Sequence, residues 1–351
     1  MYFSTNDAIY FGAICVSATG GIIANALLLY LIFYRSPKHL SPYRILLGNT
    51  ALTQLLLAGV IVTIAPRKRT SSLHHSFRVL TEGFSIANIY LGPSQFLGPW
   101  CSYMLYITML HLALNSFMSL MVSMIYRCIV LRVSTISAYG AVLMCLAGYA
   151  LPFSMLPSCV NMQYSANTTK AAEVTHYIVP HMDKYSVIVT ASILQPCILW
   201  AIFCCSFVLI PIYATMYFCR WKILTFLERA SVVQSTSTRI NTKRLVKALT
   251  IQSLVPTLSI FPPAIAYLLI QFGILGPQLF SYFIAPCLSI GPLIDPMITI
   301  YYVSPYRHFV SSTLLSHYVP SIASDTNQWR PQTSKTGYPP TTNSQNVTAP
   351  L

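Results

Sequence analysis

Apolar stretches long enough to cross a lipid bilayer recur along most of this chain. A transmembrane helix needs roughly 20 predominantly apolar residues to cross the hydrocarbon core. About seven stretches reach this length, and we expect helices over residues 8–34, 45–65, 100–126, 136–156, 187–219, 245–272 and 280–303. Because lipid cannot hydrogen-bond to the backbone, we expect an all-α seven-transmembrane helix bundle, with kinks at the prolines inside these stretches.

Charged residues are too scarce for a protein surrounded by water. They make up 8% of the chain, against roughly 25% in typical soluble domains. The net charge of +14 comes from Lys and Arg residues that lie mostly in segments flanking the apolar stretches. Membrane proteins concentrate such residues in their cytoplasmic loops, so we expect contact with membrane lipid and no nucleic-acid partner.

The distribution of Lys and Arg also predicts an orientation. With the N-terminus outside and the C-terminus inside, 15 of the 21 basic residues fall on the inner side, in residues 35–44, 127–135, 220–247 and 304–351. This bias is typical of cytoplasmic segments. The same topology places the sequon at Asn167 in an outer loop, where we expect glycosylation, and the sequon at Asn346 in the inner tail, where we do not.

The segments outside the expected helices divide into loops and a tail. Residues 83–99 are interrupted by glycines and prolines, which predicts a structured loop. A short amphipathic helix is expected at residues 306–315, so the membrane domain spans residues 1–315. Residues 316–351 are rich in Ser, Thr, Pro and Asn, which predicts a disordered cytoplasmic tail. A cleaved signal peptide begins with a basic region, and the first seven residues contain no Lys or Arg. We therefore expect the first helix to remain in the mature protein.

No motif indicates catalysis or a resident metal or cofactor. The chain has no HExxH, GxSxG or P-loop sequence, and no pair of carboxylates inside the expected helices. His176 and His181 have no evident third ligand, so neither an enzyme nor a metal site is expected. Cys101 and Cys159 both fall at the expected outer face, where the oxidising secretory route makes them a candidate disulfide.

Asp295 is the one acidic residue inside an expected helix. A lone ionisable group in hydrocarbon is costly and normally faces the bundle interior. It is either a polar switch or a neutral, hydrogen-bonded carboxyl group that only packs. Arg127, at the inner end of the third helix, is by itself interpretable as an interfacial anchor. Other embedded polar residues are expected to join helices by hydrogen bonds, namely Asn25, Asn49, Gln54, His111, Asn115, Gln195, Gln252 and Gln271.

Three of these positions resemble motifs of the seven-transmembrane G-protein-coupled receptors. Residues 47–56 are similar to the second-helix motif, with Gln54 at the position of its aspartate. Residues 126–128 are similar to the acidic-Arg-Tyr motif, with only Arg127 retained. Residues 295–299 are similar to the Asn-Pro-x-x-Tyr motif, with Asp for Asn and Thr for Tyr.

Over roughly residues 8–310 the chain resembles, more closely, the nematode serpentine chemoreceptors of the Srd class in the Str-like superfamily. The segments that carry this resemblance are residues 41–47, 92–103, 123–127, 242–256, 292–296 and 302–307. The resemblance implies a chemosensory receptor in the membrane of sensory neurons, in the cilium, that signals through a heterotrimeric G protein. Losing the acidic neighbour of Arg127 removes the usual ionic restraint on that arginine.

Relative to the receptor pattern, the carboxylate and the amide of the second and seventh helices are exchanged. We therefore hypothesise that Asn25, Gln54 and Asp295 form one buried polar cluster that couples helix rearrangement to the inner face. A transporter or a ligand-gated channel is the alternative function. It is not favoured, because the sequence shows neither a repeat between its halves nor charged rings.

Ligand and G protein are expected at opposite faces of the membrane. A small odorant or pheromone is expected in a largely apolar pocket in the outer half of the bundle, lined by Tyr103, Tyr106, His111, Gln195, Tyr267 and Gln271. Tyr103 and Tyr267 are equally interpretable as interfacial aromatics. The residues expected to face the G protein are Arg127, Arg239, Lys243, Arg244 and Lys247. The basic loop over residues 220–247 is equally suited to anionic lipid.

Overall fold

The computed structural model describes most of the membrane domain. The described residues are 5–36, 41–70, 85–130, 136–156, 188–192, 196–230, 250–251, 254–255, 257, 262, 265, 269 and 282–313. Contacts divide the chain into one unit of residues 1–308 and a second of residues 309–351. The expected boundary between membrane domain and tail, at residue 315, stays a prediction.

The long helices lie close to the positions that the apolar stretches predict. They are α1 (Thr5–Tyr34), α2 (Ser41–Ile64), α3 (Pro99–Val130), α4 (Ala138–Phe153), α7 (Pro196–Ser206), α8 (Leu209–Ala230), α11 (Ile284–Tyr302) and α12 (Ser304–Thr313). Five described helical segments are long and apolar enough to cross a membrane, one of which joins α7 to α8. α4 is a shorter apolar helix, and the expected sixth helix falls mostly outside the described residues.

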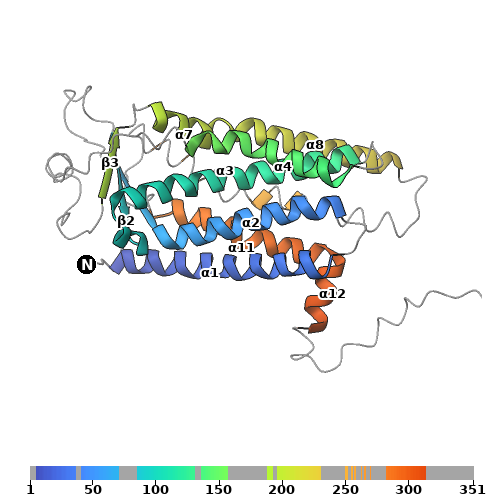
Figure 1. Cartoon of the computed structure of the whole chain (residues 1–351), viewed down its shortest axis with the longest axis horizontal. Helices are drawn as coiled ribbons and strands as arrows, with labels where there is room; N and C mark the ends of the chain where they lie inside the picture. Colours follow the sequence, from blue (N-terminus) through green and yellow to red (C-terminus); the bar gives the residue numbers. More distant parts are fainter. Residues whose placement is uncertain are drawn as a thin grey trace, which may run out of the picture. The chain divides into compact units, whose positions relative to one another are not determined.

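α3 occupies the centre of the described helices (Figure 1). It packs against α2 on one side and against α4, α7 and α8 on the others. α1 packs against both α2 and α11, so the beginning and the end of the membrane domain lie side by side. The inward faces of α2 and α3 therefore lie against other helices.

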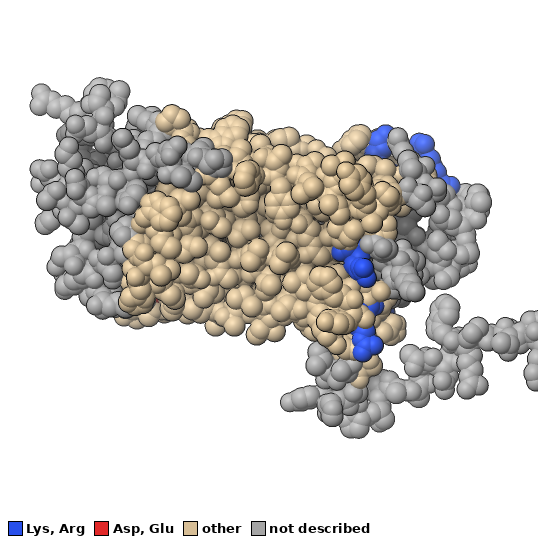
Figure 2. Space-filling model, viewed as in Figure 1, with Lys and Arg blue, Asp and Glu red and all other residues tan. Residues whose placement is uncertain are grey.

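The outer faces of the bundle are apolar, unlike the surface of a soluble protein, and several polar side chains lie inside it. Large apolar side chains are exposed on the outer faces, for example Val16 at 78% and Phe33 at 69%. Polar residues of α2, α3 and α11 are buried instead, including Gln54 at 3% and Asp295 at 4%. In Figure 2 the coloured surface is almost wholly tan, and the Lys and Arg side chains coloured there lie at the end away from the strands. This distribution matches a bundle surrounded by lipid.

A small sheet at one end of the bundle corrects two expectations (Figure 1). β1 (Pro66–Thr70) pairs antiparallel with β2 (Ser85–Tyr90), which pairs antiparallel with β3 (Ile188–Ser192). Residues 83–99 therefore contain a strand and a 3₁₀ helix, η2 (Pro93–Leu97), and not only a loop. The expected fifth helix starts too early, because residues 188–192 are extended. Their β-branched run Ile-Val-Thr favours a strand, and the helix begins at Pro196, a residue suited to a first helical position.

The expected fifth helix is also interrupted at residues 207–208, which separates α7 from α8. Pro211 has no N–H, and its ring clashes with the carbonyl four residues earlier, that of Phe207. The Phe207 carbonyl instead accepts a bond from the N–H of Ile210 at 3.2 Å, and the Val208 N–H donates to the Phe203 carbonyl, five residues back, at 3.2 Å. The proline thus produces a short turn, where the sequence predicted a kink.

The end of α2 is closed by the segment that follows β2. The last carbonyls of a helix have no partner within it. Here the Ile64 carbonyl accepts from the N–H of Gly92 at 3.1 Å, and the Ala65 carbonyl accepts from the N–H of Leu91 at 3.4 Å. A Cβ atom on Gly92 would lie 2.4 Å from the Thr63 carbonyl oxygen, so this approach requires glycine.

Replacing Gly92 by alanine should therefore destabilise the domain. Overpacking of this kind typically costs about 1–3 kcal/mol, and we expect a lower Tm for the detergent-solubilised Gly92→Ala protein. Gly59→Ala, in the interior of α2, is the matched control, because a Cβ there meets no atom within 4 Å. Alanine should be neutral or stabilising at that position. A Tm of Gly92→Ala equal to that of the wild type would contradict the close approach.

Candidate functional site

The centre of the bundle holds a hydrogen-bonded group that we name the carboxylate cluster: Gln54 of α2, Ser116 of α3 and Asp295 of α11. The Gln54 amide nitrogen donates to Asp295 Oδ2 at 2.6 Å and to Ser116 Oγ at 3.3 Å. Each of the three side chains is at most 5% exposed. One amide therefore joins three helices in a place where water does not compete for its hydrogen bonds.

Asn25 of α1 bonds the backbone of α11 and not the Asp295 side chain. Its amide nitrogen donates to the Gly21 carbonyl at 2.8 Å and to the Pro292 carbonyl at 2.7 Å. Pro296 has no N–H to donate to the carbonyl four residues earlier, which is that of Pro292. A polar side chain from a neighbouring helix thus satisfies the group that the proline frees, as transmembrane helices containing proline require.

The structure brings together two of the three residues of the hypothesised switch by a direct bond. Gln54 bonds Asp295, whereas Asn25 bonds α11 one turn before Asp295. Asn25 Oδ1 and Asp295 Oδ1 are both buried without a hydrogen-bond partner in the described structure. That a rearrangement of these residues transmits a signal stays a prediction.

A second polar group joins α2, α3 and α4, and we name it the Tyr149 cluster. The Asn49 amide nitrogen donates to Ser119 Oγ at 2.8 Å, and Asn49 Oδ1 accepts from the Tyr149 hydroxyl at 2.8 Å. Asn115 donates to Thr53 Oγ1 at 3.1 Å. Sequence reasoning found the two asparagines but missed the serines of α3 and Tyr149. The recurrence of Asn115, Ser116, Ser119 and Ser123 at helical spacing was the available signal.

At the end of the bundle away from the strands, Arg127 contacts Tyr43 of α2. The guanidinium group donates a hydrogen bond to the Tyr43 hydroxyl, and its central carbon lies 4.3 Å from the centre of the Tyr43 ring. The simple interpretation of Arg127 as an interfacial anchor did not include this partner. The remaining residues expected to face the G protein lie outside the described residues, namely Arg239, Lys243, Arg244 and Lys247.

The described candidates for ligand binding all lie on α3. Tyr103 and Tyr106 are buried in the hydrophobic cluster at the strand end of the bundle, which also contains Tyr10 and Tyr90. His111 is 8% exposed, and its Nδ1 has no hydrogen-bond partner in the described structure. Gln195, Tyr267 and Gln271 lie outside the described residues. A ligand pocket formed by these residues therefore stays a prediction.

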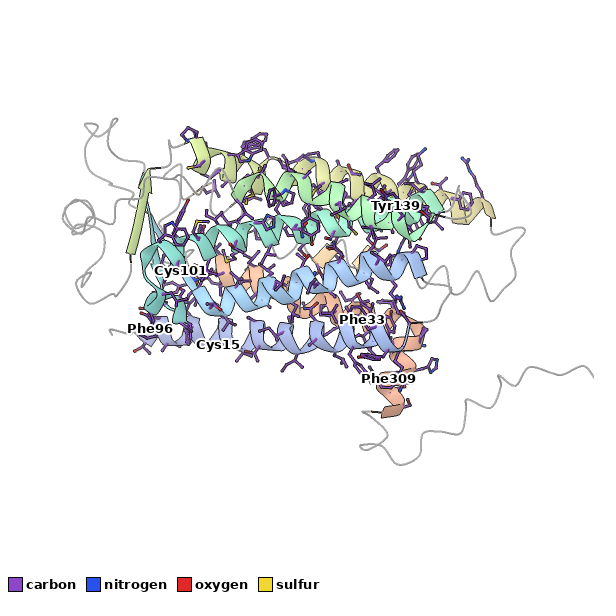
Figure 3. All side chains as sticks on the ribbon, viewed as in Figure 1. Cys15, Phe33, Phe96, Cys101, Tyr139 and Phe309 are labelled. Carbon is purple, nitrogen blue, oxygen red and sulfur yellow. The ribbon has the colours of Figure 1, made fainter. Side chains whose placement is uncertain are left out.

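The candidate disulfide is also only half described. Cys101 is a free thiol in the first turn of α3, at the strand end of the bundle (Figure 3). Cys159 and the glycosylation candidate Asn167 fall outside the described residues. The disulfide and the glycan both stay predictions.

Removing the Asn25 amide should destabilise the domain more than removing another polar contact between the same helices. Asn25→Leu keeps the side-chain volume but leaves the Pro292 carbonyl unpaired, which typically costs about 1–3 kcal/mol. Ser17→Ala is the control. It removes the 2.6 Å contact with Ser289 Oγ, but that hydroxyl retains its bond to the Pro286 carbonyl. Equal Tm shifts for the two variants would contradict the role given to Asn25.

Comparisons with known proteins agree with this architecture. A family model described as "Serpentine type 7TM GPCR chemoreceptor Srd" matches residues 10–312. Serpentine receptor class delta-32 of Caenorhabditis elegans is 41% identical over 323 residues, which cover 92% of each chain. Serpentine receptor class delta-33 of the same organism is 41% identical over 310 residues, covering 88% of this chain and 87% of the relative.

The fold is also that of a solved receptor. The crystal structure of squid rhodopsin superposes with a TM-score of 0.61 at 17% identity, over 90% of this chain and 88% of rhodopsin. This likeness confirms the seven-transmembrane helical fold, and the family is one of receptors, not enzymes. The chain is a multi-pass membrane protein and belongs to the Srd family of serpentine seven-transmembrane chemoreceptors.

Proposed function

We propose that this chain is a plasma-membrane receptor that binds a small odorant or pheromone and activates a heterotrimeric G protein. The observation that supports this proposal best is a pair of polar contacts inside an otherwise apolar bundle. Gln54 of α2 bonds Asp295 of α11 in the middle of the bundle, and Tyr43 of α2 bonds Arg127 of α3 toward one end. Because both contacts involve α2, a rearrangement of that helix would change both of them.

The strand end of the bundle suits a small apolar or amphipathic ligand. Its hydrophobic cluster contains four buried tyrosines, which are Tyr10, Tyr90, Tyr103 and Tyr106. Largely apolar sites with a few polar groups favour ligands of this chemistry. A ligand there that binds one arrangement of the helices more tightly shifts the population toward that arrangement.

The opposite end suits a cytoplasmic partner. The Lys and Arg side chains coloured in Figure 2 lie at that end. Basic residues lie there near the end of α1, in the first turn of α2, at the end of α3, in the second half of α8 and in α12, whereas β1 carries three more at the strand end. Basic residues favour the cytoplasmic side, which supports an N-terminus outside the cell and a C-terminus inside. Placement in a sensory cilium is part of the proposal.

Exchanging the amide and the carboxylate of the carboxylate cluster tests the coupling. Gln54→Glu puts two carboxyl groups in contact, and Asp295→Asn leaves two amides. Each single variant should therefore lose most of the ligand-evoked calcium or cAMP signal in reporter cells. The variant with both changes restores an amide–carboxylate pair of the same length and should recover much of that signal.

Ser17→Ala serves as the control for a lost polar contact elsewhere in the bundle, and surface expression of each variant is measured alongside. The ligand is first found with a panel of small odorants and pheromones. If the defects of the two single variants simply add in the double variant, the pair does not act as a unit. A ligand response that persists with G proteins blocked and carries ionic current would instead favour a channel.

Glycosidase treatment tests the orientation. We expect the protein from cells to shift in mobility after treatment, and we expect Asn167→Gln to abolish the shift, because a glycan is added only on the luminal side. Asn346→Gln is the matched control and should leave the shift intact. A shift that is lost only in Asn346→Gln would reverse the proposed orientation.

A further inference from the structure

We propose that Tyr43 is the positioning residue that restrains Arg127, through a hydrogen bond and a ring contact that stand in for an acidic neighbour. The proposal rests on the proposed function, because the restraint matters for signalling only if the inner end of the bundle engages a G protein. It assigns to the first turn of α2 a role that neither the sequence motifs nor the family comparison gives it.

The geometry lets one side chain hold the arginine in two ways. Tyr43 accepts a hydrogen bond from the Arg127 Nη2 group. The guanidinium carbon also lies 4.3 Å from the centre of the Tyr43 ring, within the range of a cation–π contact. Tyr126 packs against Tyr43, with their ring centres 6.1 Å apart. Tyr126 is 6% exposed, so the contact lies against a buried aromatic ring and is partly shielded from solvent.

No described carboxylate is available to hold Arg127 instead. The flanking residues are Tyr126 and Cys128. The acidic side chains that the structure describes are Asp7, which accepts a bond from Tyr282, and Asp295, which is bonded to Gln54. Arg127 thus has a neutral phenol as its described partner. A neutral partner stabilises a guanidinium group less than a carboxylate does, so Tyr43 forms a weaker and more easily released restraint.

The restraint is also incomplete. Arg127 Nη1 is buried and has no hydrogen-bond partner in the described structure. A buried donor without a partner raises the free energy of the conformation that contains it. A conformation that offers Arg127 a further acceptor would therefore be favoured over the observed one.

Basal nucleotide exchange tests the restraint without a known ligand. Wild type, Tyr43→Phe and Tyr43→Leu are reconstituted in lipid nanodiscs and mixed with purified heterotrimeric G proteins. The net contribution of a typical intramolecular hydrogen bond corresponds to a shift of about three- to tenfold in an equilibrium constant. We expect Tyr43→Phe to raise basal exchange about threefold, because the ring contact remains, and Tyr43→Leu to raise it about tenfold.

Tyr282→Phe is the matched control, since it also removes a phenol hydrogen bond, the one to Asp7 at 3.2 Å, but lies outside both polar clusters and does not touch Arg127. It should leave basal exchange unchanged. If Tyr43→Phe and Tyr43→Leu give the same basal exchange as Tyr282→Phe while the wild type stimulates exchange, the proposal is overturned.

A double-mutant cycle supplies a readout that needs no G protein. Tyr43→Phe should lower the Tm of the solubilised receptor by about 2–4 °C. In the Arg127→Met background, which has no guanidinium group, the same change should have less than half that effect. Additive Tm shifts would overturn the contact itself. The Tm cycle could show coupling while neither the wild type nor any variant stimulates nucleotide exchange. That outcome would contradict the proposed function but would leave the Tyr43–Arg127 contact supported.

Discussion

Hydrogen bonding among polar groups that have no access to water is the constraint on which the rest of this structure depends. In hydrocarbon an unpaired amide or carboxyl group is costly, so each one ties its helix to another. Gln54 ties α2 to both α3 and α11, and Asn25 ties α1 to α11. The apolar outer faces do not determine which helices become neighbours, because lipid solvates these faces equally well in any arrangement of the helices. A small number of polar side chains therefore adds direction to the apolar packing that joins the helices.

Proline and glycine determine where these helices approach and where they break. Pro296 frees a carbonyl on α11 that Asn25 then binds, and Gly21 of α1 allows the approach, since a Cβ there would lie 3.3 Å from the Pro292 backbone. Pro211 acts differently, because no described side chain bonds the Phe207 carbonyl and the chain turns at that point. The outcome of a proline in a membrane helix thus depends on whether a neighbour supplies a donor.

The sequence was sufficient for the approximate positions of the first, second, third, fourth and seventh helices, because length and hydropathy decide where a membrane helix lies. It also predicted that Asp295 faces the bundle interior, because an ionisable group in contact with lipid is costly. It also identified Gln54 as a candidate partner of that carboxyl group. It did not predict the sheet, because β1 begins with Pro-Arg-Lys-Arg, a segment whose pairing depends on strands far away in the chain. Nor did it predict Tyr43 or Tyr149 as partners, because aromatic residues in membrane helices are common and only packing reveals which ones meet a polar group.

Gln54 and Asp295 are bonded to each other and hold α2 against α11. A thermal double-mutant cycle with apolar replacements, Gln54→Met and Asp295→Leu, measures this interaction. Each single variant leaves one polar group buried without its partner, so each should lower the Tm of the solubilised receptor. The double variant leaves neither group unpaired and should regain most of the loss. If the double variant instead loses the sum of the two single shifts, the two side chains are not partners and the account is contradicted.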